Sequence, residues 1–326
     1  MDWRNKKIYI AGSGGMVGSA IVRNLENKGF TNLIRKSSSE LNLINQTEVE
    51  KFFKSERPEI VILAAAKVGG ILANNNFRAE FIYDNLMIEA NVIQSAYKHE
   101  AEKLIFLGTS CIYPKNAPQP IKEEYLLSNY LESTNEPYAV AKIAGIKLCE
   151  SFYRQYGCDF FSVMPTNLYG QNDNFDLETS HVLPALIRKF HEAKVDRAKK
   201  VLLWGSGKPR REFMYVDDLA DAVVFLMQNI KAADLYERGI SQINIGTGID
   251  LEISELADLI KEIVGFTGAI EYDATKPDGT PRKMLDVSRI NELGWKYTTT
   301  LEDGLRKTYD WFLKANAGNS KSAVQL

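Results

Sequence analysis

The sequence is short of the residues that build disulfide frameworks and metal sites. Among its 326 residues are three cysteines, Cys111, Cys149 and Cys158, and only three histidines. The cysteines do not follow a metal-ligand spacing, and three of them do not suggest a disulfide framework. We therefore expect neither a metal centre nor a disulfide-stabilised fold.

Long apolar runs and an excess of one charge are also lacking. No apolar run approaches the roughly 18 residues of a membrane-spanning helix, and no apolar signal-peptide segment follows residues 1–7. The formal net charge of −2 argues against a nucleic-acid-binding surface. Apolar content of 45% and charged content of 25% are ordinary for a globular protein. We expect a cytoplasmic protein that binds neither membranes nor nucleic acid.

Short apolar runs alternate with helical patterns through the first half of the chain. Such alternation is typical of an α/β fold with a doubly wound parallel (Rossmann) sheet. It predicts strands at 7–12, 32–35, 59–66, 103–109 and 159–166, and helices at 16–28 and 78–99.

After about residue 167 this rhythm loosens, which indicates a second, smaller α/β domain. We expect the first domain to span 1–167 with a returning segment near 212–246, and the second to span 168–211 and 247–326. The second half contains a polar loop at 171–180, a short strand at 243–246, a helix at 254–264 and a turn-rich surface loop at 276–281.

A glycine-rich turn joins the first expected strand to the first expected helix. Glycines at this turn allow a sharp bend, close approach of the backbone to a pyrophosphate, and close packing of helix on strand. The strand–turn–helix context distinguishes a dinucleotide site from an ordinary turn. The expected cofactor contacts here are Gly12, Ser13, Gly14, Gly15, Met16, Val17 and Gly18.

Two cations at the end of the second strand indicate which dinucleotide binds. An NAD site usually places an acid there for the ribose 2′-hydroxyl, whereas an arginine accommodates a 2′-phosphate. This chain has Arg35 and Lys36 at that place, and the nearest acid, Glu40, lies farther along. The alternative is a pair of solvated cations on a loop. We predict NADP as the cofactor.

Tyr138 and Lys142 lie four residues apart on one face of a helix that Pro137 can begin. An ammonium beside a phenol favours the phenolate and lowers the tyrosine's pKa from its usual value of about 10. Such a tyrosine can exchange a proton with a carbonyl–alcohol pair. This spacing alone more often marks a solvated helix face. The glycine-rich turn and the hydroxyl of Thr109 favour the catalytic interpretation.

Thr109, Ser110 and Cys111 end the fourth strand, where ligands of open α/β sheets bind. The hydroxyl of Thr109 can bond a substrate oxygen opposite Tyr138, although a polar strand end can also satisfy its own backbone. Cys111 lies beside that hydroxyl and is a candidate acid or base, whereas an isolated cysteine is more often structural. His181 follows a polar loop, where an unselected histidine is more often a cap or a surface residue.

Together these motifs resemble the extended short-chain dehydrogenases/reductases that act on nucleotide sugars. Further segments resemble the GDP-L-fucose synthase family, which are GDP-4-keto-6-deoxy-D-mannose 3,5-epimerases/4-reductases using NADPH. The resemblance runs from about residue 6 to residue 312 and implies a homodimer built on helices of the first domain. The segments that carry it are 64–71, 108–114, 135–142, 164–170, 204–207, 211–213 and 276–283.

The resemblance implies residue roles by position. It makes Tyr138 and Lys142 the catalytic pair and Cys111 and His181 the epimerisation acid and base. Thr109 stands where the family often has serine and keeps the hydroxyl. Bulkier basic residues often stand at positions 13 and 14, so one cationic contact to the cofactor phosphate is missing here. Cofactor contacts would include Leu107, Gly108, Thr109, Ser110, Lys142, Pro165, Thr166, Asn167, Leu168 and His181, and nucleotide-sugar contacts Lys189, Trp204, Arg211, Asp278 and Lys283.

Other functions keep most of these motifs. A C4-reductase without epimerase activity, acting on a related GDP-4-keto sugar such as a heptose, would conserve the same pattern. A non-catalytic NADP-binding protein would tend to lose Tyr138 or Lys142, and both are present. Sugar dehydratases of the superfamily carry Asp-Glu where this chain has Ser110 and Cys111. We therefore expect an NADPH-dependent conversion of GDP-4-keto-6-deoxy-D-mannose to GDP-L-fucose.

Overall fold

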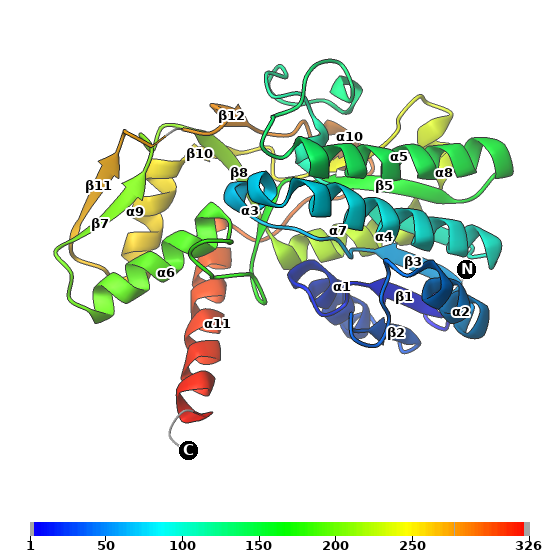
Figure 1. The fold of residues 1–326 in the computed structure, drawn as a ribbon, viewed down its shortest axis with the longest axis horizontal. Coiled ribbons are helices and arrows are strands. Elements are labelled where there is room, and N and C mark those ends of the chain that lie inside the picture. The colour runs from blue at the N-terminus through cyan, green and yellow to red at the C-terminus, as the bar shows by residue number, and fades with distance from the viewer. Residues whose placement is uncertain (1–2, 277, 323–326) are drawn as a thin grey trace.

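A six-stranded parallel sheet forms the centre of the computed structural model, which describes residues 3–276 and 278–322 (Figure 1). Its inner strands are apolar and buried, so helices must cover both faces. The strand order is β2-β1-β3-β4-β5-β9, and all pairs are parallel. The strands are β2 (Leu33–Lys36), β1 (Ile8–Ala11), β3 (Ile60–Leu63), β4 (Lys103–Leu107), β5 (Phe160–Pro165) and β9 (Ile243–Ile245).

Two hydrophobic clusters cover the two faces of this sheet and confirm the predicted doubly wound fold. One cluster joins the sheet to α1 (Met16–Asn27) and α7 (Val216–Asn229). The other joins it to α2 (Gln46–Glu56), α4 (Arg78–Lys98) and α5 (Glu136–Tyr156). Because the chain turns from β2 across β1 to β3, the crevice at the carboxyl ends of β1 and β3 is a topological switch point, where ligands bind in such sheets.

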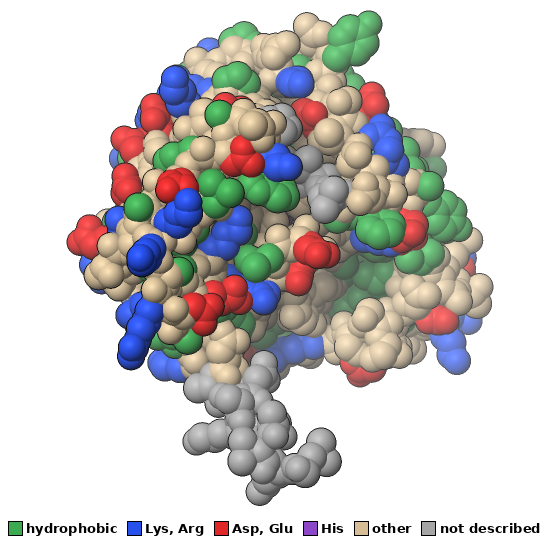
Figure 2. Space-filling view, turned by 60° about the vertical axis from the view of Figure 1, so that its left-hand side comes forward, with side chains coloured by type: hydrophobic (Ala, Val, Ile, Leu, Met, Phe, Trp, Pro, Cys, Tyr) green, Lys and Arg blue, Asp and Glu red, His purple; other side chains and the backbone are tan. Residues whose placement is uncertain are grey.

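Smaller sheets and a third hydrophobic cluster form the part drawn at the left of Figure 1. Lys and Arg side chains intermingle with Asp and Glu side chains on this side (Figure 2). Strand β8 (Arg210–Tyr215) pairs with β10 (Asp250–Glu252), β12 (Arg282–Lys283) and β6 (Asn167–Tyr169), and β7 (Lys200–Trp204) pairs with β11 (Ala269–Asp273). The helices of this part are α6 (Val182–Val195), α9 (Ile253–Val264) and the projecting α11 (Leu301–Ser322). Elsewhere in the chain the shorter helices are α3 (Ile71–Asn76), α8 (Ala232–Tyr236) and α10 (Ser288–Glu292), and 3₁₀ turns lie at Ser110–Ile112 and Glu123–Tyr125.

The predicted elements are confirmed with small changes at their ends. The strand expected at 59–66 stops at Leu63, after which the chain leaves the sheet beside the glycine-rich turn. The loops at 171–180 and 276–281 lack helix and strand in their described residues, and Pro277 lies outside them, as do residues 1–2. Within the described chain, no helix is both long enough and apolar enough to cross a membrane.

Candidate active site

The glycine-rich turn between β1 and α1 has the geometry of a phosphate-binding turn. Gly12 has a φ of +85°, and a Cβ there would lie 2.8 Å from the backbone of Ala65. A Cβ on Gly18 would collide with the carbonyl of Gly12, so both positions require glycine. Space is open beside Gly14, and no described side chain caps the N-terminus of α1. Free N–H groups and a positive helix end therefore fit a pyrophosphate here.

Arg35 and Lys36 lie at the carboxyl end of β2, the strand next to β1. The register pairs Lys36 with Ala11, the last residue before the glycine-rich turn. Arg35 forms an ion pair with Glu26, and Lys36 Nζ lies 3.5 Å from a carboxylate oxygen of Glu40. Both ion pairs are solvent-exposed, so they hold the cations weakly. The two side chains are therefore free to accept a phosphate at this edge of the site.

The carboxyl end of β4 brings a hydroxyl and a thiol together. Gly108 donates its N–H to Val163 O at 2.9 Å, which fixes the strand end against β5. Thr109 accepts a bond of 3.3 Å from the Cys111 N–H through its side-chain oxygen. The oxygen of this hydroxyl therefore already accepts a hydrogen bond from its own backbone segment, as the alternative interpretation expected. Its proton remains free to donate to a ligand.

Tyr138 and Lys142 lie in the first two turns of α5, where Pro137 occupies the first turn as predicted. The ammonium of Lys142 is 5.9 Å from the centre of the Tyr138 ring. It is buried, lies 3.1 Å from Glu89 Oε1 and donates a bond of 3.1 Å to Leu107 O. The sequence placed this pair correctly.

The expectation of a lowered tyrosine pKa is wrong for this structure. Burial raises the pKa of Tyr138, and the nearby Cys111 and Glu89 raise it further. The ammonium of Lys142 does not reverse this effect, because it pairs with the carboxylate of Glu89. Tyr138 is therefore a proton donor, not a phenolate, around neutral pH.

A lysine from the far end of the chain contacts the candidate thiol. Lys283 Nζ donates a bond of 3.3 Å to Cys111 Sγ, from a position 172 residues along the chain. His181 precedes α6 as its N-cap residue. Although His181 is exposed overall, neighbouring protein atoms lower the pKa of its imidazole by desolvation, and the charge of Lys283 lowers it further. One lysine therefore contacts the thiol of Cys111 and also acts on the imidazole of His181 through its charge.

Arg211 and Asp278 lie next to Lys283 and farther from the thiol of Cys111. Arg211 lies on β8 opposite Lys283 of β12 in the sheet register. Burial lowers the pKa of Arg211, whereas the charges of Cys111 and Asp278 raise it. Asp278 accepts bonds from Ser206 N at 2.8 Å and from Ser206 Oγ at 2.6 Å, which fix the loop after β7. Two cations therefore face the same space as the thiol.

Trp204 ends β7 with an indole that is 70% exposed. The ammonium groups of Lys189 and Lys276 lie 5.7 Å and 5.5 Å from the centre of its ring. Two cations on an exposed aromatic ring form a surface suited to a planar, negatively charged ligand. Lys276 was not among the predicted site residues, although its segment was part of the resemblance.

The segment after β5 joins the two halves of the site. Pro165 ends β5, and Leu168 lies in β6. Thr166 Oγ1 and Asn167 Nδ2 donate bonds of 3.3 Å and 2.8 Å to the same acceptor, the carbonyl of Glu212. These bonds hold the end of the parallel sheet to β8, the strand that carries Arg211.

Comparison with known proteins places the chain in a family. Residues 8–246 match the NAD dependent epimerase/dehydratase family. The chain belongs to this family. It is 58% identical over 314 residues to GDP-L-fucose synthase 1 of Arabidopsis thaliana, covering 96% of this chain and 95% of that relative. It is 55% identical over 311 residues to GDP-L-fucose synthase of Escherichia coli K12, covering 95% and 97%.

A solved structure of the epimerase/dehydratase fold is also similar. The structure of the GDP-mannoheptose C4 reductase of Campylobacter jejuni with NADP bound matches this chain with a TM-score of 0.89 and 44% sequence identity. The match covers 96% of this chain and 100% of that one. Within the family, the sequence is thus more similar to the two fucose synthases than to this reductase.

In this epimerase/dehydratase the observed contacts also involve Glu89, an acid that the sequence analysis did not single out. Glu89, which pairs with Lys142, lies on α4, whose buried face also carries the uncharged polar residues Asn85, Asn91 and Ser95. Its signal was weak, because a single acid within an apolar stretch of α4 has no motif around it.

Proposed function

We propose that this chain is a GDP-L-fucose synthase, an NADPH-dependent enzyme that inverts C3 and C5 of GDP-4-keto-6-deoxy-D-mannose and reduces C4. The observation that carries the proposal is the 3.3 Å contact of Lys283 Nζ with Cys111 Sγ. A thiol with a cationic donor beside it serves proton transfer at carbon, for which a simple reductase has no use. The 58% identity to a fucose synthase, against 44% to a C4 reductase, supports the same conclusion.

Epimerisation follows from the chemistry of the C4 ketone. Its carbonyl acidifies the protons on C3 and C5, because loss of either proton gives an enolate with charge on the ketone oxygen. Tyr138 and Thr109 donate hydrogen bonds to that oxygen as the charge develops. Cys111 removes a proton, and His181 returns one to the opposite face, which inverts each centre in turn. Lys283 holds the thiol in place for this exchange.

Reduction uses the same ketone and the same tyrosine. Bound NADPH supplies the hydride for C4. Tyr138 gives its proton to the C4 oxygen, and its raised pKa keeps that proton on the phenol until the transfer. The positive charge of Lys142 stabilises the phenolate left behind.

The cofactor fits one side of the site and the sugar nucleotide the other. We assign the cofactor side to residues 1–167 with the segment 212–246, and the sugar side to 168–211 and 247–326. Arg35 and Lys36 would face the 2′-phosphate. The remaining cofactor residues are Gly12, Ser13, Gly14, Gly15, Met16, Val17, Gly18, Leu107, Gly108, Thr109, Ser110, Lys142, Pro165, Thr166, Asn167, Leu168 and His181.

The GDP group is matched by cations and one aromatic ring. Arg211 and Lys283 lie on adjacent strands and would offset the charge of a diphosphate. The exposed ring of Trp204 offers a stacking surface for a base, with Lys189 beside it. Asp278 fixes the loop that carries this ring through its bonds to Ser206.

Replacement of the thiol tests this function. Cys111→Ser keeps the size of the side chain but replaces the thiol with a hydroxyl, which is a far weaker acid. In heavy water, NMR of the wild-type product should show deuterium at C3 and C5. The variant should stop the labelling and yield only an unepimerised C4 alcohol.

Each alternative function gives a different result in this experiment. A dedicated reductase would oxidise NADPH with a GDP-4-keto sugar yet leave C3 and C5 unlabelled in the wild-type protein. A non-catalytic NADP-binding protein would show no turnover at all. Cys149→Ser is the matched control, because that thiol is buried between α5 and the sheet. It should leave the labelling unchanged.

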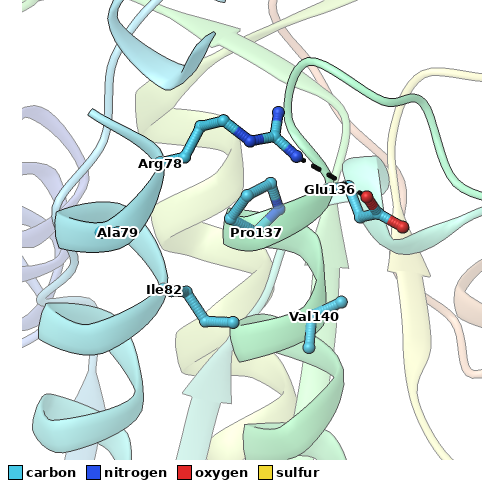
Figure 3. Close-up of a pocket in the computed structure, with 6 residues that line it drawn as sticks. All are labelled: Arg78, Ala79, Ile82, Glu136, Pro137 and Val140. Carbon is cyan, nitrogen blue, oxygen red and sulfur yellow. Dashed lines mark ion pairs between the residues drawn. The ribbon is translucent and has the colours of Figure 1, made fainter. Parts of the chain in front are cut away.

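We also propose that the enzyme is a homodimer that pairs through α4 and α5. These helices border a shallow hollow of about 320 Å³ away from the catalytic residues (Figure 3). Arg78, Ala79 and Ile82 line it from α4, and Glu136, Pro137 and Val140 from α5. Val140 is 40% exposed, and Tyr83 of α4 is 59% exposed. An apolar groove edged by the Arg78–Glu136 ion pair suits the same surface of a second copy.

The oxidation state of the cysteines indicates the cellular compartment of the enzyme. All three cysteines are free. Free thiols are usual in a reducing compartment, and we propose the cytoplasm as the location.

A further inference from the structure

A buried acid lies behind the proposed catalytic pair. Glu89 of α4 and Lys142 of α5 are each 1% exposed, and 3.1 Å separates Glu89 Oε1 from Lys142 Nζ. Apart from this ion pair, neither Oε1 nor Oε2 finds a hydrogen-bond partner among the described residues. The ammonium is held on its other sides by Leu107 O at 3.1 Å and by the face of the Phe106 ring, whose centre is 4.6 Å away.

The neighbouring helix is shaped around this acid. Gly145 lies on α5 one turn after Lys142. A Cβ at this position would lie 2.8 Å from Glu89 Oε2 and 2.5 Å from the Phe106 ring. Only a residue without a side chain therefore lets the carboxylate reach Lys142 between the two helices.

Stability does not explain the presence of two buried charges. Removing a carboxylate and an ammonium from water costs more than their mutual attraction usually returns, and apolar pairs of similar volume often stabilise a core better. The ion pair instead holds the ammonium of Lys142, the lysine of the proposed catalytic pair. It therefore acts on the catalytic residue itself.

We propose that Glu89 is a positioning residue that holds the ammonium of Lys142 in place behind Tyr138 while Tyr138 donates its proton to the C4 oxygen. The inference rests on the catalytic roles proposed for Tyr138 and Lys142. It assigns the acid no contact with substrate or cofactor.

The electrostatic setting of Glu89 supports this role. Burial raises its pKa to about 7, against the opposing effect of Lys142. The negative charge of Glu89 raises the pKa of Tyr138, so loss of that charge lowers it. The ionisable groups of the described chain that face Glu89 all come from α5. They are Lys142, Tyr138 and Cys149. The other elements packed on α4 bring side chains that do not ionise. Strand β3 is apolar, α2 turns Val49, Phe52 and Phe53 inward, and α3 contributes the amide of Asn74.

The pH profile of hydride transfer tests the proposal. Single-turnover oxidation of NADPH with GDP-4-keto-6-deoxy-D-mannose should rise in the wild-type protein through a limb near pH 7, as Glu89 loses its proton, and then level off. Glu89→Gln should abolish this limb and slow the transfer at pH 8 on the order of 10- to 100-fold, since a displaced catalytic group costs that much. Its alkaline limb, where Tyr138 loses its proton, should move to lower pH.

A matched control separates this role from packing. Glu150→Gln removes an acid of the neighbouring helix α5, one that pairs with Lys147 and Arg154, and should keep the wild-type profile. A folded Glu89→Gln protein that keeps the wild-type pH profile, with only a lower melting temperature, would overturn the proposal.

A second measurement tests the proposal if the Glu89→Gln protein does not fold. In a Cys111→Ser/His181→Asn background the epimerisation groups are gone, so a limb near pH 7 in NADPH oxidation reports on the reduction centre. A flat profile from pH 6 to 8.5 there would also overturn the proposal. Failure of the underlying function looks different: the wild-type protein would not oxidise NADPH, or Tyr138→Phe would react at the wild-type rate.

Discussion

At the scale of single residues, Lys283 serves both halves of the proposed chemistry. Its ammonium contacts the thiol of Cys111, and its strand neighbour Arg211 faces the same space. Its charge also lowers the pKa of His181. One cation therefore influences the base, the acid and the expected diphosphate position.

Lys283→Met should slow proton exchange more than hydride transfer. Methionine keeps the length of the side chain but removes the bond to Cys111 Sγ. At saturating sugar, deuterium entry at C3 and C5 should fall by about 10²-fold, the lower range for a positioned acid–base group, while C4 reduction falls much less. The alkaline limb of the exchange, where His181 loses the proton that it must return, should move to higher pH, because the pKa of His181 rises once the nearby positive charge is gone.

The control for this change is Lys276→Met, which removes a cation from Trp204 but not from the thiol. It should raise the KM for the sugar nucleotide and leave the exchange rate at saturation intact. Equal losses of exchange in both variants would contradict the assigned role of Lys283.

The sequence predicted residue identities better than residue states. Tyr138 and Lys142 follow from a local four-residue spacing on one helix. The direction of the tyrosine's pKa shift does not, because it depends on burial and on Glu89, which approaches from another helix. Likewise Cys111 and Lys283 are 172 positions apart, and only folding shows that they touch.

At the scale of elements, we propose that the end of β2 sets the choice of cofactor. Its register places Arg35 and Lys36 beside the last residues of β1, next to the phosphate-binding turn. The ion pairs of these cations with Glu26 and Glu40 are exposed and weak, so a phosphate can replace them.

Arg35→Ala together with Lys36→Ala should raise the KM for NADPH far more than that for NADH. Only NADPH carries the 2′-phosphate, and each charge-assisted bond to a phosphate is worth about 1.5–3 kcal/mol. Steady-state kinetics with both cofactors measure the ratio. Lys98→Ala, which removes an exposed cation at the C-terminus of α4, is the control. An equal change for the two cofactors would rule out a 2′-phosphate site at β2.

The elements of the first half were predictable because parallel strands buried on both faces are continuous apolar runs. Helix α2 was not predicted, although Asn45 caps it by accepting bonds from the N–H groups of Thr47 and Glu48. The smaller sheets escaped prediction for a different reason. Their strands are short and join distant segments, as β12 does when two residues pair with β8.

At the scale of the whole molecule, the site lies between two packed regions while the proposed dimer surface lies on the outer side of α4 and α5. The catalytic residues and the groove share helix α5, on which Tyr138 is followed two positions later by Val140. Pairing through this groove would brace the proposed catalytic helix from its outer side.

Val140→Asp should convert the dimer to monomers. It places a charge in the apolar floor of the groove, next to Pro137 and Ile82, where a partner surface would bury it without a counter-charge. Light scattering after gel filtration should give twice the chain mass of 36.8 kDa for the wild-type protein and the single mass for the variant.

Tyr130→Asp, which changes an 88% exposed side chain outside the groove, should remain dimeric. Because Val140 lies two positions after Tyr138, and therefore on the opposite side of α5, the monomer should keep measurable turnover with a lower melting temperature. A wild-type protein of single mass at micromolar concentration, or a variant that stays dimeric, would show that this groove does not pair two copies.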